Sequence, residues 1–165
     1  MNTFSRFACA LLVATAVQAP LLATAQAADS AAAKAVKQQT LTQKNKALVM
    51  KAYQELFGDH DFGALDRYWG DTYIQHNPYM ADGREGVREF VEKMGYFKGP
   101  KQKIDFLRVI AEGDLVMVQV RQPASPASPE MVVVDIFRVE KNKIVEHWDV
   151  MQAVPADATN KRPMY

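Results

Sequence analysis

The sequence predicts an α+β domain in which N-terminal helices pack on the concave face of a curved, antiparallel or mixed sheet. Two observations lead to this prediction. Segments with apolar residues at helical spacing fill the first half of the chain, and segments in which apolar residues alternate fill the second half. Helices followed by a run of long strands are typical of α+β folds. A conical domain of this kind leaves a cavity that the helices only partly fill, where a small ligand can bind.

The first 27 residues have the pattern of a secretory signal peptide. One basic residue, Arg6, precedes an apolar run over 8–17, and a stretch of small residues ends at Ala27. The apolar run is too short for a comfortable membrane span. We therefore expect cleavage after about Ala27 and export, most simply to a bacterial periplasm. No stable membrane insertion is expected after cleavage; an uncleaved N-terminal anchor is the alternative.

Cleavage would remove Cys9, the only cysteine, so neither a disulfide nor thiol chemistry is expected in the mature chain. The chain has 20 Lys and Arg against 19 Asp and Glu. Such a balance provides no electrostatic footprint for nucleic acid or for an anionic membrane surface. We expect a linker or frayed helix over 28–39, a single domain over 40–153 and a loose tail over 154–165.

Helices with buried apolar faces are expected before the long strands. The first helix begins after a capping threonine, either Thr40 or Thr42, and ends at Gly58. Asp82 is expected to cap the third helix. The remaining boundaries expected are 62–69 and 84–97 for the second and third helices, and 72–76 for a short strand between them.

The second half of the chain predicts two hairpins. Strands over 104–112 and from residue 115 onward flank the turn residues Gly113 and Asp114. The segment 123–129 contains three prolines and must be a loop, because proline removes a hydrogen-bond donor and fixes the backbone. The sequence leaves open whether this loop is a lid or an idle insertion. The last hairpin spans 131–152.

The turn of the last hairpin sets which residues face each other. Residues 140–142 suit a three-residue loop with Asn142 in the left-handed conformation. This loop would place Asp135 opposite His147, whereas a two-residue loop would place Trp148 opposite Asp135. Side chains alternate across a sheet, so the three-residue loop puts one set of residues on a shared face. That set is Val133, Asp135, Phe137, Val145, His147, Asp149 and Met151.

Asp149, His147 and Asp135 are the candidate catalytic residues. Two carboxylates and an imidazole among apolar side chains can exchange protons near neutral pH, which suits general acid–base catalysis. A solvated strand face and a structural Asp135–His147 ion pair are the alternatives. Together with His76, these residues could form a metal site of two histidines and carboxylates, but their spacing matches no ligand motif. We expect no metal and no cofactor.

Polar and aromatic residues before the long strands are the candidate substrate-binding groups. His76 and Asn77 could hydrogen-bond a substrate carbonyl, although the His-Asn-Pro run could equally stabilise a turn. Aromatic side chains could form an apolar wall, although a core role is their commonest one. The wall candidates are Trp69, Tyr73, Tyr96 and Phe97.

The order of elements and the segments YIQHNP, DGREGVREF and VDIFRVEKNKIVEHWDVMQ resemble the SnoaL-like, polyketide-cyclase-like branch of the nuclear transport factor 2-like superfamily. The resemblance covers residues 42–152. It implies a cystatin-like conical fold, a homodimer, an apolar pocket and no metal or organic cofactor. In the cyclase branch, an acidic residue on a late strand is the acid/base of an aldol closure, and Asp149 matches it best. His76 and Asn77 fall where such members place polar pocket groups.

The sequence thus predicts an exported, cofactor-free enzyme that acts on a small apolar carbonyl compound by aldol-type cyclisation, isomerisation or a lyase reaction. The alternative is a non-catalytic periplasmic module that binds a small hydrophobic ligand, because one fold can host either role. We also expect a homodimer through the outer face of the sheet, with Trp148 and Ile136 as contacts.

Overall fold

The computed structural model describes residues 19–124 and 128–165. Most of the expected signal peptide, and the middle of the Pro-rich loop at 125–127, lie outside the described residues. The chain divides between Lys37 and Gln38 into two units, and the second unit, Gln38–Tyr165, contains the whole sheet. The site described below lies entirely within this second unit.

Helix α1 spans Ala19–Tyr53 and begins well before the expected threonine caps. The residues expected to form a linker or frayed helix, 28–39, are helical and exposed. They are rich in alanine, lysine and glutamine, which favour helix, and no glycine or proline interrupts them. A π-helical turn, η1 (Gln54–Gly58), continues α1 to the glycine at which the helix was expected to end. No helix within residues 19–124 and 128–165 combines the length and apolarity needed to cross a membrane.

Two short helices flank the first strand. Helix α2 is Gly63–Tyr68, strand β1 is Trp69–Gln75 and helix α3 is Gly83–Met94. Gly95 ends α3 in the left-handed conformation, with a φ of 68°, and the 3-10 turn η2 (Tyr96–Lys98) follows. Asp82 precedes α3 as expected, but its side chain makes no capping hydrogen bond. Its Oδ1 instead accepts the backbone N–H of Gln75 at 2.8 Å, which ties α3 to the end of β1.

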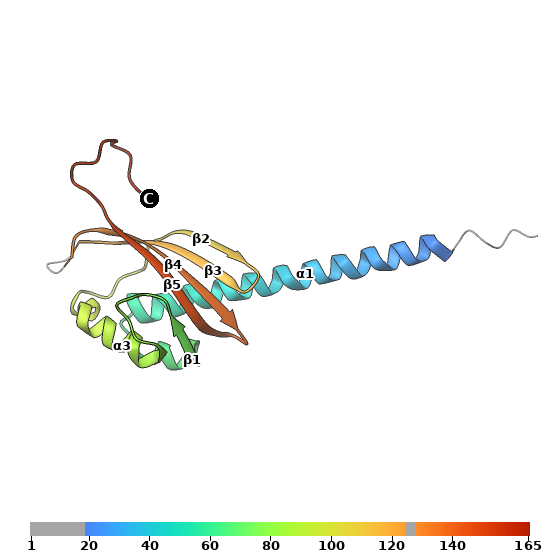
Figure 1. Ribbon diagram of the computed structural model, residues 1–165, viewed down its shortest axis with the longest axis horizontal. Coiled ribbons are helices and arrows are strands. Elements are labelled where there is room, and N and C mark those ends of the chain that lie inside the picture. The colour runs from blue at the N-terminus through green and yellow to red at the C-terminus, as the bar shows by residue number, and fades with distance from the viewer. Residues whose placement is uncertain (1–18, 125–127) are drawn as a thin grey trace, which may run out of the picture. The chain divides into compact units, whose positions relative to one another are not determined.

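The sheet is mixed and has the strand order β1-β5-β4-β3-β2, in which β1 is parallel to β5 and the other pairs are antiparallel. The C-terminal turns of α1, together with α2 and α3, lie on one face of the sheet (Figure 1). The expected α+β class and helix-covered sheet are confirmed. The long strands are β2 (Phe106–Glu112), β3 (Leu115–Gln122), β4 (Met131–Glu140) and β5 (Lys143–Ala153).

The last hairpin differs from both expected registers. Its loop has two residues, Lys141 and Asn142, with φ values of 49° and 61°, as a tight type I′ turn requires. A register shift then occurs between Arg138 and Val139, because Arg138 pairs with Glu146 whereas Val139 pairs with Ile144. Val145 is therefore the extra residue of a bulge. Ile144, rather than the expected Val145, packs in the core, where it is 1% exposed.

The turn and the bulge together move the register by two residues from the expected one. Asp135 lies opposite Asp149, and Phe137 lies opposite His147. A shift of two keeps the alternation of side chains, so Asp135, His147 and Asp149 still share the helix-covered face. Burial of apolar side chains between this face and the helices stabilises the fold by about 1.5–3 kcal/mol for each large residue. The largest of these fully buried side chains are Trp69, Leu56, Leu65, Ile144, Val49 and Val91.

The opposite face of the sheet carries an apolar row that crosses four strands. Ile110 on β2 pairs with Met117 on β3, which pairs with Ile136 on β4, which pairs with Trp148 on β5. We call these four residues the outer row. The ring of His76 extends it beyond β5, because it stacks on Trp148 at 4.8 Å between ring centroids.

Candidate active site

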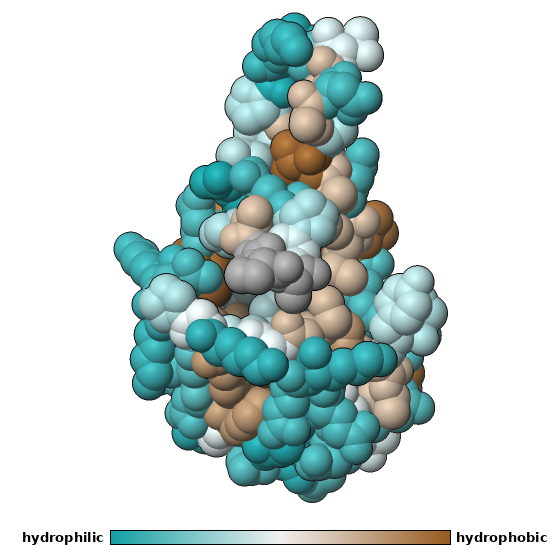
Figure 2. All heavy atoms as spheres, turned by 90° about the vertical axis from the view of Figure 1, so that its left-hand side faces the viewer, coloured by the Kyte–Doolittle hydropathy of each residue, from teal (hydrophilic) through white to brown (hydrophobic). Residues whose placement is uncertain are grey.

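A cavity of about 110 Å³ lies between the helices and the sheet of the second unit. Its walls are mainly apolar and include several aromatic side chains, and one part of the lining carries Asp135, His147 and Asp149. The surface around the end of the molecule that carries α3 is mostly hydrophilic, with small apolar patches (Figure 2). The aromatic lining residues are Tyr53, Phe57, Trp69, Tyr73, Phe90, Tyr96 and Phe137.

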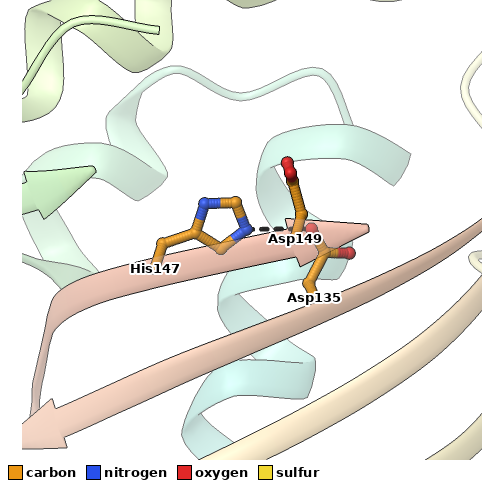
Figure 3. Close-up of side chains that lie close together, drawn as sticks. All are labelled: Asp135, His147 and Asp149. Carbon is orange, nitrogen blue, oxygen red and sulfur yellow. Dashed lines mark hydrogen bonds and ion pairs between the residues drawn. The ribbon is translucent and has the colours of Figure 1, made fainter. Parts of the chain in front are cut away.

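The two carboxylates and the imidazole project from the same side of the β4–β5 hairpin (Figure 3). Asp135 and Asp149 are direct cross-strand neighbours, and His147 lies two residues before Asp149 on β5. One ligand-type atom from each of the three lies within 4.8 Å of the others. The hairpin thus brings together all three residues that the sequence singled out as catalytic candidates.

Asp135 and His147 form a buried pair. His147 Nε2 lies 2.9 Å from Asp135 Oδ1, and the two residues are only 4% and 6% exposed. The Tyr53 hydroxyl, from the last turn of α1, donates to Asp135 Oδ2 at 3.1 Å. Burial, and next the negative charge of Asp135, raise the pKa of Tyr53 well above its usual value, so this hydroxyl keeps its proton. Phe137 stacks on the imidazole at 4.7 Å between ring centroids.

Asp149 is held differently, by a side-chain amide. The Asn77 Nδ2 group donates to Asp149 Oδ2 at 2.6 Å, and Asn77 is itself buried. The backbone N–H of Tyr79 donates to Asn77 Oδ1 at 2.8 Å, which fixes the amide so that its NH₂ faces Asp149. Asp149 is half-buried and lines the cavity. No residue in the described part of the chain hydrogen-bonds its second oxygen.

Two of the expected binding residues lie elsewhere. His76 does not line the cavity, because the chain alternates at the end of β1 and turns its side chain to the outer face. There its Nε2 lies 2.9 Å from Glu146 Oε1. Phe97 is also absent from the lining, and it packs on Phe62 at 4.4 Å between ring centroids. Of the other expected binding residues, Trp69, Tyr73 and Tyr96 line the cavity. Asn77 does not line it, but it hydrogen-bonds Asp149, which does.

Tyr53 and Gln75 were not singled out from the sequence as site residues. Tyr53 has an apolar helical position that predicted only a core role, and its contact with Asp135 spans 82 residues. The Oε1 atom of Gln75 lies 2.9 Å from His147 Nδ1 and accepts a hydrogen bond from the backbone N–H of Asn77, also at 2.9 Å. One signal could have identified Gln75: it shares the alternation of Tyr73 along β1, and a polar side chain on a buried strand face needs a partner.

Asp135, His147 and Asp149 are the group within the described residues that could hold a metal ion. In this geometry both nitrogens of His147 are engaged, Nε2 by Asp135 and Nδ1 by Gln75. A metal ion could bind His147 only by displacing one of these hydrogen bonds. The arrangement instead suits proton exchange, because Asp149 presents an oxygen to an apolar cavity.

Comparison with known proteins identifies the fold family. A family model described as "SnoaL-like domain" matches residues 50–147. No curated protein matches the chain.

Three solved structures illustrate the likeness. TsrD from Streptomyces laurentii is 24% identical over 66% of this chain and 88% of its own, with a TM-score of 0.53. A candidate polyketide cyclase from Acidithiobacillus ferrooxidans is 20% identical over 66% and 87%, with a TM-score of 0.54. An epoxide hydrolase of M. tuberculosis, described as LEH-like, is 19% identical over 67% and 84%, with a TM-score of 0.52. At these identities the likeness shows the fold.

Proposed function

Since the chain belongs to the family of SnoaL-like domains, we propose that it is an enzyme that moves protons on a small apolar carbonyl compound. The observation that carries this proposal is Asp149: it lines the cavity, one of its oxygens is fixed by Asn77, and its other oxygen has no hydrogen-bond partner among the described residues. A carboxylate in that position can remove a proton next to a carbonyl group, because the apolar walls exclude competing water.

The proposed chemistry uses Asp149 as both base and acid. Its carboxylate takes a proton from the carbon next to the carbonyl, which leaves an enolate and a neutral carboxylic acid. The acid then returns the proton, either to the alkoxide formed by an aldol closure or to another carbon in an isomerisation. His147 and Asp135 are positioning residues in this scheme, because both nitrogens of His147 are already hydrogen-bonded.

The cavity limits the substrate to a small molecule. Its volume of about 110 Å³ is of the same order as engineered apolar cavities of about 150 Å³ that accept benzene. The aromatic side chains around it favour a flat or cyclic compound. A cyclic ketone or enone with about one ring is therefore the proposed substrate class.

Enolisation can be tested without knowledge of the natural substrate. The purified protein is incubated in D₂O with a panel of small cyclic ketones and enones, and exchange at the carbon next to the carbonyl is followed by NMR. We expect Asp149→Asn to lower the exchange rate by about 10² to 10⁴. Asp157→Asn, at an exposed position in the tail, is the control. An Asp149→Asn protein as active as the wild type would refute the proposed role.

The alternative function is a binding module for a small hydrophobic ligand. The observation in its favour is that two of the three candidate catalytic residues, Asp135 and His147, are tied to each other and buried. Native mass spectrometry of the purified protein, with analysis of released small molecules, separates the two functions. A ligand recovered unaltered after long incubation would support binding, and recovery of a product would support the enzyme.

We also propose that the protein is exported and acts in the periplasm. The support is the sequence of residues 1–27, with its basic start, apolar run and small-residue end. Intact mass measurement of the protein recovered from a periplasmic extract tests this proposal. A mass that corresponds to a chain beginning near Ala28 would support cleavage, and a full-length chain retained in the cell would contradict it.

A homodimer through the outer row is proposed as the assembly. The row crosses four strands, and the Arg138–Glu146 pair lies beside it, so a second copy related by a two-fold axis would meet an equivalent surface. Ile110 is 58% exposed, so the row ends in a large apolar side chain at the surface of the single chain. Light scattering should give twice the chain mass for the wild type and the single mass for Ile136→Lys. A monomeric wild type would reject the dimer.

A further inference from the structure

We propose that Gln75 is a positioning residue that fixes a proton on His147 Nδ1 and thereby sets the protonation of the buried Asp135–His147 pair. The inference rests on the proposed function only for its catalytic consequence. The protonation itself follows from hydrogen-bond geometry in the ligand-free protein.

The first step is the orientation of the Gln75 amide. Its Oε1 lies 2.9 Å from the backbone nitrogen of Asn77. A backbone N–H can only donate, so the amide atom that faces it must be the oxygen. The amide nitrogen lies on the other side, where it donates to the Tyr73 hydroxyl oxygen at 3.3 Å and approaches the sulfur of Met80 at 3.8 Å.

The second step is the proton on His147. Its Nδ1 lies 2.9 Å from the same Gln75 oxygen, which carries no hydrogen. Two acceptors cannot share a hydrogen bond, so Nδ1 must bear the proton. The register supports this contact, because Gln75 is the direct neighbour of His147 across the parallel β1–β5 pair. The backbone N–H of His76 also donates to the backbone carbonyl oxygen of His147 at 3.0 Å.

The opposite nitrogen of His147, Nε2, faces Asp135. His147 Nε2 lies 2.9 Å from Asp135 Oδ1, and this contact needs a proton of its own. The proton is either on Nε2, which gives an imidazolium beside a carboxylate, or on Asp135, which gives a neutral pair. In both states the pair carries two protons and no net charge. Neither nitrogen has a lone pair to offer to a substrate.

The consequence is a division of roles between the two carboxylates. Asp135 and Asp149 face each other across the strands, and two like charges at that position would repel. A pair with no net charge at Asp135 and His147 removes this repulsion. Asp149 is then the one member of the group that can exchange a proton with a substrate without breaking the hydrogen bond between Asp135 and His147. Gln75 acts on the reaction through His147 and does not itself line the cavity.

The test is an NMR measurement of the histidine nitrogens. The chain contains three histidines, so the full-length protein labelled with ¹⁵N-histidine gives a short spectrum. His76→Gln and His60→Asn assign the signals of the other two histidines; asparagine suits position 60, where φ is 57°. At neutral pH we expect the Nδ1 signal of His147 to have the shift of a protonated nitrogen. A neutral His147 with its proton on Nε2 alone would overturn the proposal.

Two substitutions at Gln75 separate positioning from simple structural support. Gln75→Leu removes the acceptor that faces Nδ1. A neutral imidazole with its one proton on Nε2 then satisfies the remaining hydrogen bond, to Asp135, so the Nδ1 signal should move to the unprotonated position. Gln75→Glu keeps an acceptor oxygen and should restore the wild-type signal. Gln119→Leu, on the outer face, is the matched control and should leave His147 unchanged.

A Gln75→Leu protein whose Nδ1 signal matches the wild type would refute the role of Gln75. These spectra are recorded without substrate. If no ketone exchanges but Nδ1 of His147 is protonated, the proposed reaction is rejected and the protonation of His147 stands. If the enzyme is active but His147 carries its proton on Nε2 alone, only the role of Gln75 is rejected.

Discussion

Strand β5 contributes one residue to a histidine–carboxylate pair on each of its faces, His147 on the inner face and Glu146 on the outer face, and the two pairs have nearly the same geometry. On the inner face, His147 lies 2.9 Å from Asp135 and stacks on Phe137. On the outer face, His76 lies 2.9 Å from Glu146 and stacks on Trp148. The inner side chains are 5% and 8% exposed, whereas the outer ones are 42% and 14% exposed.

This difference in exposure separates a site for chemistry from a surface ion pair. The outer carboxylate, Glu146, is also bound by Arg138 at 2.6 Å, and in the single chain it remains partly accessible to water, which screens its charge. The inner carboxylate, Asp135, has only Tyr53 and His147 as hydrogen-bond partners within the described residues. Away from water, loss of one partner leaves the other group buried and unpaired. The same pair of residue types is therefore replaceable on one face and critical on the other.

Removal of the inner carboxylate should give the largest effect. Asp135→Ala leaves the imidazole of His147 and the hydroxyl of Tyr53 without an acceptor in the core. We expect a loss of about 3–5 kcal/mol in the free energy of unfolding, as for other buried pairs that lose one partner. Urea unfolding followed by tryptophan fluorescence measures the change.

The matched change on the outer face is Glu146→Ala, which should destabilise the protein far less. Equal losses for the two variants would show that burial does not distinguish the pairs. A further variant, Asp135→Leu with His147→Phe, replaces the whole inner pair by apolar groups. It should be more stable than Asp135→Ala, because no unpaired imidazole remains.

The comparison also shows what the sequence could predict and what it could not. Alternation predicted that Asp135, His147 and Asp149 share a face, and this holds because the turn and the bulge together shift the register by an even number. The actual neighbours were not predicted, since nothing in the local sequence marks Val145 as a bulge. His76 was expected to point into the pocket, but it lies one residue beyond the last inward position of β1. Contacts distant in the chain, such as Tyr53 with Asp135, have no local signal.

At alkaline pH, the buried tyrosines on the inner side of the sheet should lose their protons later than ordinary tyrosines. Burial raises the pKa of Tyr53, Tyr73 and Tyr96, and the charge of Asp135 raises each further. A raised pKa in the folded state means that the stability from these groups is complete below the unfolded value of about 10 and is lost as the pH rises above it. Tyrosinate absorbance should therefore show a late-titrating group that coincides with unfolding.

A phenylalanine variant checks this assignment. Tyr53→Phe should reduce the late-titrating absorbance, because the Tyr53 hydroxyl is buried and its pKa is raised. A single transition at the ordinary tyrosine pKa for all six tyrosines would contradict the raised values.

Acid pH should give the smallest effect, and Glu146 on the outer face should contribute part of it. Hydrogen bonds from His76, and next from Arg138, lower the pKa of Glu146 below its ordinary value. A lowered pKa in the folded state means that this stabilisation is complete above the unfolded value of about 4.3 and is lost as the pH falls through the folded value. The free energy of unfolding should therefore decline more gently below about pH 4.3 in Glu146→Gln than in the wild type. Glu112→Gln, at an exposed position on β2, should keep the wild-type decline. If Glu146→Gln also kept it, the outer pair would contribute nothing to acid stability, and burial alone would account for the difference between the two faces of β5.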